Sequence, residues 1–167
     1  MNQTFNYGAF EAARPLMDRI PEILPGAIIA GGYLRDELLG REVKDMDIFV
    51  ESVTPEQLAT LAAAMGIPPF REYALGEDGD FTDTDGQMDP EYTRDSGRVS
   101  RVEELFKGDG EDVIVTNSIE DHFREFPDNI SKVYYGKYGL VLTPEFIGGH
   151  ATKRIVYRDA AGGAGGR

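Results

Sequence analysis

The amino-acid sequence predicts a mixed α/β (α+β) domain in which helices flank a mixed β-sheet. In the first half of the chain, amphipathic segments alternate with short apolar runs of strand composition. In the second half, several strand-like runs follow one another with a single helical segment among them. The 167 residues suit one domain, which we expect to cover residues 1–160, with the Gly-rich residues 161–167 as a flexible tail.

The first half is expected to contain two helix–strand pairs and a third helix. The pairs are a helix over residues 9–20, a strand over 27–30, a helix over 33–39 ending at Gly40, and a strand over 46–50. The third helix has the clearest start signal. Thr54 precedes Pro55 at the first helical position and Gln57 at the third, which together form a capping box, and Gly66 ends the helix.

The middle of the chain differs from both halves in composition. Residues 72–111 are rich in Asp, Gly and Thr and show little apolar periodicity, so we expect an acidic insertion with one short helix around residues 102–106. The elements expected after it are a strand over 112–116, a helix over 118–126, strands over 131–136 and 139–143, a turn or short helix over 143–149, and a strand over 153–157.

The acidic composition restricts the classes of partner. Thirty acidic residues face 17 basic ones, giving a net charge of −13. Because gripping a nucleic-acid duplex requires a basic face, we expect no strong autonomous duplex binding. Cysteine is absent, which excludes disulfides and thiol catalysis. No apolar run reaches the roughly 18 residues of a membrane helix, and the start shows no secretory pattern, so we expect a cytoplasmic protein without a membrane partner.

The residues with the clearest chemistry lie in the stretch GGYLRDELLGREVKDMDIFV, residues 31–50. Asp45 and Asp47 are two positions apart at the start of the predicted strand, and side chains at that spacing point to the same face. Two neighbouring carboxylates repel each other unless a cation or a proton lies between them. The sequence therefore predicts a site for a hard divalent cation, Mg²⁺ or Mn²⁺.

The start of this stretch suits an anionic ligand. Gly31 and Gly32 lie between a strand and a short helix, where backbone without Cβ atoms can approach phosphate oxygens closely. Arg35 offers a charge-assisted contact to phosphate, and Asp36 either pairs with a basic neighbour or reaches a sugar hydroxyl. Each feature alone is more commonly a turn or a surface pair, whereas their combination favours a nucleoside triphosphate (NTP) ligand.

The order GG-x-x-R-D-x-L-L-G (residues 31–40) followed by K-D-x-D-I (residues 44–48) resembles the signature of the nucleotidyltransferases of the DNA polymerase beta superfamily. The closest branch is the head domain of CCA-adding enzymes and bacterial poly(A) polymerases. The resemblance implies a nucleotidyltransferase fold in which three carboxylates hold divalent metal, two of them Asp45 and Asp47. It assigns nucleotide binding to Gly31, Gly32, Arg35, Asp36 and Lys44.

The later part of the chain resembles this family more loosely, and is more similar to short stand-alone nucleotidyltransferase-like proteins found in bacteriophage genomes. For a phage-encoded chain, the expected location is the host cytoplasm. Asp112 is the candidate for the third catalytic and metal-binding carboxylate, with Glu111 as the neighbouring choice. Asp128 and Asn129 are candidates for nucleotide contacts. The helical domains with which CCA-adding enzymes hold tRNA have no counterpart, so the resemblance implies a catalytic head with an acidic insertion rather than a tRNA enzyme.

Three functions follow as hypotheses. The first is metal-dependent transfer of a nucleoside monophosphate from an NTP to an acceptor hydroxyl on an RNA 3′ end, a small molecule or a protein. The second is a degenerate nucleotide-binding or interaction protein with the same fold, which binds NTP without turnover. The third is adenylylation of a protein, as in the minimal nucleotidyltransferases of toxin–antitoxin pairs.

Overall fold

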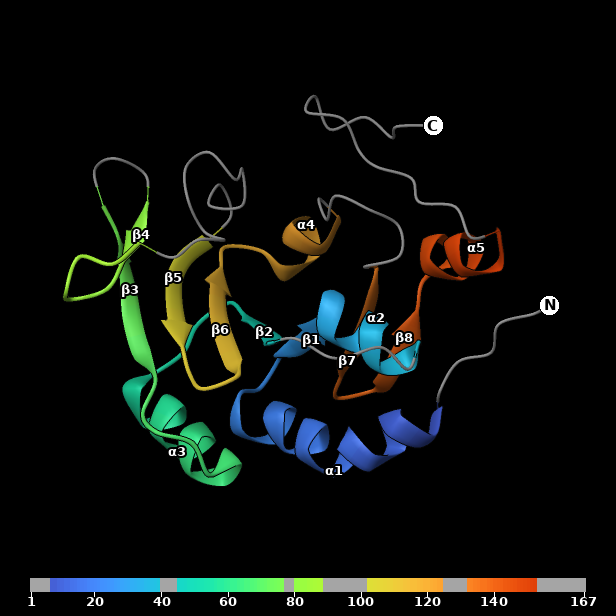
Figure 1. Ribbon diagram of the computed structural model, residues 1–167, viewed down its shortest axis with the longest axis horizontal. Helices are drawn as coiled ribbons and strands as arrows, with labels where there is room; N and C mark the ends of the chain where they lie inside the picture. Colours follow the sequence, from blue (N-terminus) through green and yellow to red (C-terminus); the bar gives the residue numbers. More distant parts are fainter. Residues whose placement is uncertain (1–6, 40–44, 77–79, 89–101, 125–131, 153–167) are drawn as a thin grey trace.

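The computed structural model describes residues 7–39, 45–76, 80–88, 102–124 and 132–152, and these form one sheet with helices on both faces (Figure 1). The helices are α1 (Tyr7–Ile23), α2 (Gly32–Leu38), α3 (Pro55–Met65), α4 (Ile119–Arg124) and α5 (Pro144–Thr152). The strands are β1 (Ile28–Ala30), β2 (Met46–Val50), β3 (Arg71–Leu75), β4 (Phe81–Thr82), β5 (Val102–Lys107), β6 (Glu111–Thr116), β7 (Val133–Gly136) and β8 (Gly139–Leu142).

The strands form a mixed sheet in the order β4-β3-β5-β6-β2-β1-β7-β8. Strands β2 and β6 are parallel, and the remaining neighbours are antiparallel. The mixed α/β class expected from the sequence is therefore confirmed. The parallel pair lies in the middle of the sheet, although about sixty residues of sequence separate its two strands.

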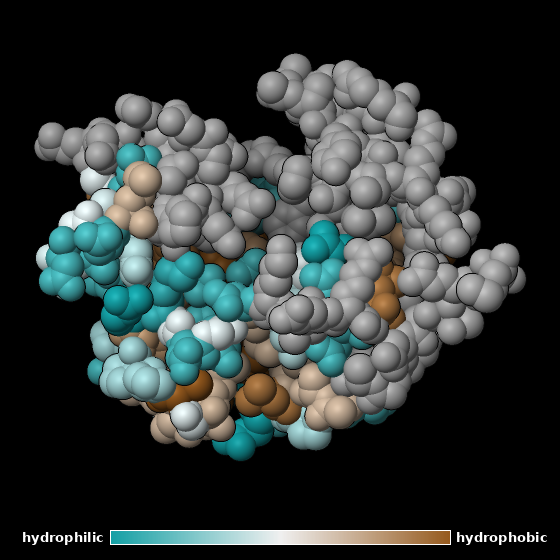
Figure 2. Space-filling model, viewed as in Figure 1, coloured by the Kyte–Doolittle hydropathy of each residue, from teal (hydrophilic) through white to brown (hydrophobic). Residues whose placement is uncertain are grey.

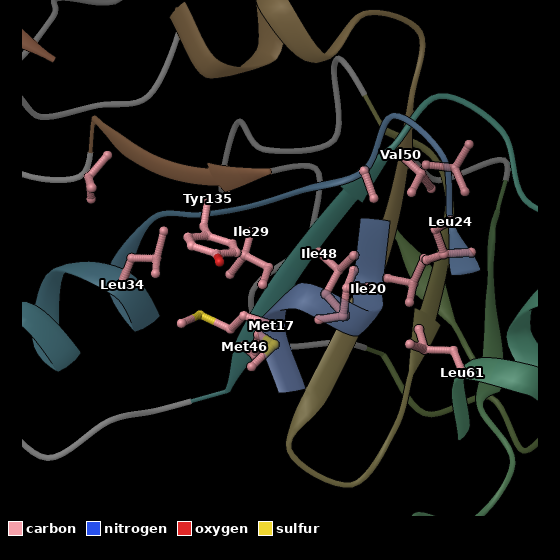
Figure 3. Packing of buried hydrophobic residues seen from close by; sticks show 14 of the residues in the cluster. Met17, Ile20, Leu24, Ile29, Leu34, Met46, Ile48, Val50, Leu61 and Tyr135 are labelled. Carbon is pink, nitrogen blue, oxygen red and sulfur yellow. The ribbon is translucent and has the colours of Figure 1, made fainter. Parts of the chain in front are cut away.

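The main apolar core lies between one face of the sheet and helices α1 and α3 (Figure 3). Met17, Ile20 and Leu24 recur at helical spacing and are at most 1% exposed, so one side of α1 is buried against the sheet. Ile48 and Val50 of β2 point to the same core. The hydroxyl of Tyr135 on β7 donates a hydrogen bond to Asp18, which ties α1 to the sheet at a polar point.

The opposite face of the sheet carries a smaller apolar cluster. Phe49 and Ile114, which alternate with the core residues of β2 and β6, belong to it, and Ile119 and Phe123 of α4 pack against it. Both faces of the central strands are thus covered by helices, as expected for a sheet with a parallel pair. Within the described residues, no helix is long and apolar enough to cross a membrane.

The capping box predicted for the third helix is present. Thr54 accepts a hydrogen bond from the Gln57 amide at 3.1 Å, and its own amide donates to Gln57 Oε1 at 2.9 Å. Gly66 ends α3 in the left-handed conformation, with φ 67° and ψ 33°. Local signals at both ends therefore fix this helix, whose apolar side buries Leu61 in the core.

The helix predicted around residues 102–106 is wrong, because residues 102–107 form strand β5. Leu105 pairs with Ile114 and Phe106 with Val113 of β6, so antiparallel pairing with the next strand along the chain overrides the local helix preference of a Glu-Glu-Leu sequence. Strand β4 and all but the first residue of β3 also fall within residues 72–111, so the described parts of this segment extend the sheet. Its status as an insertion stays a prediction.

Two further differences concern the second half of the chain. The turn or short helix expected over residues 143–149 is the longer helix α5, which begins after Thr143 and buries Phe146 in the core. The strand expected over residues 153–157 lies outside the described residues. In the view of Figure 2, hydrophilic residues dominate the side formed by β3 and β4, and apolar residues show mainly between α1 and α3.

Candidate functional site

The strand register places the predicted carboxylates on one face of the sheet. In the parallel pair β2–β6, Asp47 lies directly opposite Asp112. Residues opposite each other on adjacent strands have side chains on the same face, and Asp45 lies just before β2, two positions ahead of Asp47. This face, called the aspartate face below, is the face of the smaller cluster, to which Phe49 and Ile114 belong. The register thus joins two sequence segments that were predicted to share a site.

The three carboxylates differ in their exposure. Asp112 is 1% exposed, Asp47 is half-buried, and Asp45 is exposed at the start of β2. Within the described part of the chain, no three acidic or histidine side chains converge as a group able to hold a metal ion. The structure therefore brings Asp47 and Asp112 side by side on adjacent strands, without gathering a complete set of metal ligands around one point.

Lys107 is a residue of this site that the sequence analysis missed. It lies opposite Asp112 in the antiparallel pair β5–β6, and its Nζ atom is 3.4 Å from Asp112 Oδ2. The signal in the sequence was the Asp-Gly dipeptide at 109–110, a common hairpin turn, which would have placed the strand before it against β6. Because residues 102–106 were predicted to be helical, the pairing of β5 with β6 was not predicted.

Glu111, the alternative third carboxylate, lies on the other face of the sheet. It is opposite Met46, and it alternates with Val113 and Val115 of the main core. Burial raises the pKa of Glu111 to about 7, with further contributions from the negative charges of Asp109, Asp45 and Asp112. The register therefore favours Asp112 over Glu111 as the partner of Asp47.

The raised pKa of Glu111 predicts a pH-dependent stability. The folded protein keeps this proton up to about pH 7, whereas the unfolded chain releases it near pH 4.3, so the free energy of unfolding falls as the pH rises between those values. We expect Glu111→Gln to stabilise the metal-free protein by about 1 kcal/mol at pH 8, a figure reduced for solvent screening, and to have little effect at pH 4. Urea unfolding at both pH values measures this difference; an equal effect at the two values would contradict it.

The glycine turn lies beside Asp47. Strands β1 and β2 are antiparallel with Ile29 opposite Ile48, so Ala30 comes level with Asp47 and the turn follows directly. Gly31 has φ 85° and ψ −146°, a conformation that residues with a Cβ atom rarely adopt. Its carbonyl accepts the first hydrogen bond of α2 from the Arg35 amide at 3.2 Å. Only glycine suits this connection between β1 and α2.

Arg35 lies against the backbone of Gly32. A Cβ atom on Gly32 would come within 3.2 Å of Arg35 Nη2. The guanidinium is oriented by Asp36, which is 4% exposed: Arg35 Nε donates to Asp36 Oδ1 at 3.0 Å, and Nη2 to Oδ2 at 3.4 Å. Of the two roles considered for Asp36, the structure shows pairing with a basic neighbour. This pair holds a cationic, planar group at the glycine turn.

Three predicted nucleotide-binding residues, Lys44, Asp128 and Asn129, lie outside the described residues. A hollow of about 600 Å³ is present elsewhere on the aspartate face, lined by Ile28, Glu51, Phe123 and Tyr134 among others. Among its lining residues, Glu51 follows β2, and Tyr134 of β7 lies opposite Ala30, the residue before the glycine turn. The hollow is not lined by Asp47, Asp112 or the glycines of the turn.

Comparison with known proteins finds a family match over the segment that carries the glycine turn and the Asp-x-Asp pair. The poly A polymerase head domain matches residues 27–69, a segment that contains the glycine turn, Arg35, Asp45 and Asp47. No curated protein matches the chain.

Among solved structures, a tRNA-processing enzyme in an apo form has a similar fold, with a TM-score of 0.51 and 19% identity over 87% of this chain and 38% of that one. The Bacillus stearothermophilus CCA-adding enzyme in complex with CTP gives 0.48 and 18% over 89% and 33%. The Thermotoga maritima CCA-adding enzyme complexed with tRNA gives 0.45 and 15% over 81% and 30%.

The chain spans about a third of the length of these solved structures. The similarity to the tRNA-processing enzyme concerns the fold, since the identity is low. The resemblance seen in the sequence is nevertheless confirmed for one segment: residues 27–69 are similar to the poly A polymerase head domain.

Proposed function

We propose that the protein transfers a nucleoside monophosphate from an NTP to an acceptor hydroxyl in a metal-dependent reaction. The observation that carries the proposal is the register that sets Asp47 opposite Asp112, with Asp47 on β2, the strand next to β1 and the glycine turn. The match of residues 27–69 to a nucleotidyltransferase head domain supports it. Carboxylates and a phosphate-binding turn on adjacent strands are the two parts that this chemistry requires.

The donor atoms on this face suit Mg²⁺ or Mn²⁺. Carboxylate oxygens are the ligands that hard divalent cations prefer; Asp47 and Asp112 would supply them from one face of the sheet, and Asp45 from the residue before β2. A divalent cation bound there would polarise a phosphoryl oxygen and offset the charge that develops during transfer. The chain supplies the ligands, and their fixed positions on paired strands limit how far they must move.

The remaining residues position the two substrates. Gly31, Gly32 and Arg35 would hold the triphosphate, since the turn admits close approach and Asp36 keeps the guanidinium at the turn. Asp112 would orient the acceptor hydroxyl and accept its proton. The acceptor oxygen then bonds to the α-phosphorus, the bond from that phosphorus to the bridging oxygen of the β-phosphate breaks, and pyrophosphate leaves.

The proposal is tested by incubating the protein with each α-³²P-labelled NTP, Mg²⁺ or Mn²⁺, and the RNA and protein fractions of a lysate. We expect label on one fraction, which identifies the acceptor class, and loss of that label in Asp45→Asn and Asp112→Asn. Asp85→Asn, which changes an exposed carboxylate on the loop after β4, is the matched control and should keep wild-type labelling. Binding of NTP with no label on any fraction would exclude the transferase.

One observation favours the second candidate, a nucleotide-binding protein without turnover. The ammonium of Lys107 is already paired with Asp112, one of the three carboxylates. If Asp112 is only a structural partner of Lys107, then Asp112→Asn should leave NTP affinity unchanged, and the labelling experiment should show no transfer. The two candidates therefore give opposite results in the same assay.

A further inference from the structure

Four charged residues form a row across the aspartate face of the sheet. Asp47 of β2 lies opposite Asp112 of β6, Asp112 opposite Lys107 of β5, and Lys107 opposite Arg71 of β3. The strand order sets two acids and two bases side by side in that sequence. Lys107 is therefore the cation next to the proposed metal ligands, on the side of Asp112 away from Asp47.

The two bases of the row are not equivalent. Arg71 is exposed, with 66% of its side chain accessible, and it is directed towards Asp83, with 3.8 Å between Nη1 and Oδ2. Lys107 has 17% of its side chain accessible and contacts Asp112, whose side chain is 2% accessible. Burying a carboxylate is costly unless an opposite charge or hydrogen bonds compensate for it. Lys107 supplies that opposite charge within the protein.

We propose that Lys107 is the resident counter-cation of Asp112, and that its ammonium and a divalent cation at Asp47 and Asp112 weaken each other's interaction with the site. This inference rests on the proposed function, because it concerns the same carboxylates. Two positive charges that share one carboxylate repel each other, and this coupling is reciprocal. The free energy by which the lysine weakens metal binding equals the free energy by which bound metal weakens the Lys107–Asp112 interaction.

The consequence is a site that binds metal more tightly when nucleotide is present than when it is absent. The three aspartates together carry a charge of −3, and the ammonium of Lys107 reduces the net charge of the site to −2. The free site therefore attracts a divalent cation less strongly. A triphosphate adds the negative charge that the lysine has cancelled. Metal alone should therefore bind weakly to the wild-type protein, and metal with NTP should bind well. In this role Lys107 is a positioning residue, which acts through Asp112.

The test is Mn²⁺ binding to the metal-free, full-length protein, followed by the electron paramagnetic resonance signal of free Mn²⁺. We expect Lys107→Met to bind Mn²⁺ about tenfold more tightly than wild type, since a nearby positive charge has been removed. Lys107→Arg keeps the charge and should bind as wild type does. Lys137→Met is the matched control: it removes a charge from the exposed turn between β7 and β8 and should change nothing.

Thermal unfolding gives an independent reading. In EDTA, Lys107→Met should lower the unfolding temperature. The double variant with Asp112→Asn should lose less stability than the sum of the losses in the two single variants. In saturating Mn²⁺, the loss caused by Lys107→Met should shrink. A merely structural lysine would lower the midpoint equally with and without metal.

The outcomes separate the two proposals. If wild-type binding of Mn²⁺ depends on Asp47 but Lys107→Met binds it equally or more weakly, the counter-cation inference is wrong and the metal-dependent function stands. If neither the wild type nor Lys107→Met binds Mn²⁺ in an Asp47-dependent way, with or without NTP, the metal-dependent function fails and the inference fails with it.

Discussion

Asp47→Asn is expected to lower the rate of nucleotide transfer roughly a thousandfold, which corresponds to about 4 kcal/mol of transition-state stabilisation. Asp47 is the central carboxylate of the site: it is two positions from Asp45, lies opposite Asp112, and is level with the end of β1 before the glycine turn. Asparagine has the same shape but carries no charge. The substitution therefore removes the negative charge of a proposed metal ligand and is expected to leave the packing of β2 intact.

The rate is measured with labelled NTP under single-turnover conditions, and Mn²⁺ binding is measured on the same samples. Asp47→Asn should keep the wild-type unfolding midpoint within a few degrees, since Asp47 is only partly buried. Asp85→Asn again serves as the control and should leave the rate unchanged. A rate in Asp47→Asn within about threefold of wild type, about 0.7 kcal/mol, would remove this residue from the catalytic site.

Gly31→Ala is expected to destabilise the protein by about 2 kcal/mol and to weaken NTP binding. The backbone angles of Gly31 lie in a region that is essentially restricted to glycine, so an alanine is strained or moves the start of α2. A shifted helix start displaces Arg35 from Gly32, and the proposed triphosphate contacts are lost with it. Urea unfolding measures the stability, and titration with a fluorescent NTP analogue measures the affinity.

Gly66→Ala is the matched control for this change. Gly66 also has a positive φ, and a Cβ atom there would meet nothing within 4 Å. It ends α3, remote from the glycine turn, and alanine in its left-handed conformation should cost about 1 kcal/mol. Equal NTP affinity in Gly31→Ala, Gly66→Ala and wild type would show that the turn does not hold the triphosphate.

The parts of the fold that sequence could predict are those determined by neighbouring residues. Thr54, Pro55, Gln57 and Gly66 specify both ends of α3 within one segment, and that helix is as expected. Strand β5 was missed because its Glu-Glu-Leu sequence favours a helix locally, and only hydrogen bonds to β6 make it a strand. Lys107 was missed for the same reason, since its position beside Asp112 depends on that pairing.

The candidate site shows the same division. The glycine turn and the Asp-x-Asp pair lie within twenty residues of each other, so their spacing alone indicated a common site. The choice between Asp112 and Glu111 depends on which of two adjacent residues points to the face of Asp47. A shift of one position reverses that answer, and the register that settles it is formed between strands far apart in the sequence.

The parallel pairing of β2 with β6 also has a consequence for how the protein folds. Asp47 and Asp112 are 65 positions apart (112 − 47), and they meet only when that long-range contact closes. Contacts of high sequence separation form slowly, because the entropy of closing the intervening loop is lost before the contact is gained. The segment 27–69 therefore cannot assemble the carboxylate pair without the later strand, and the pair should appear only when the centre of the sheet has formed.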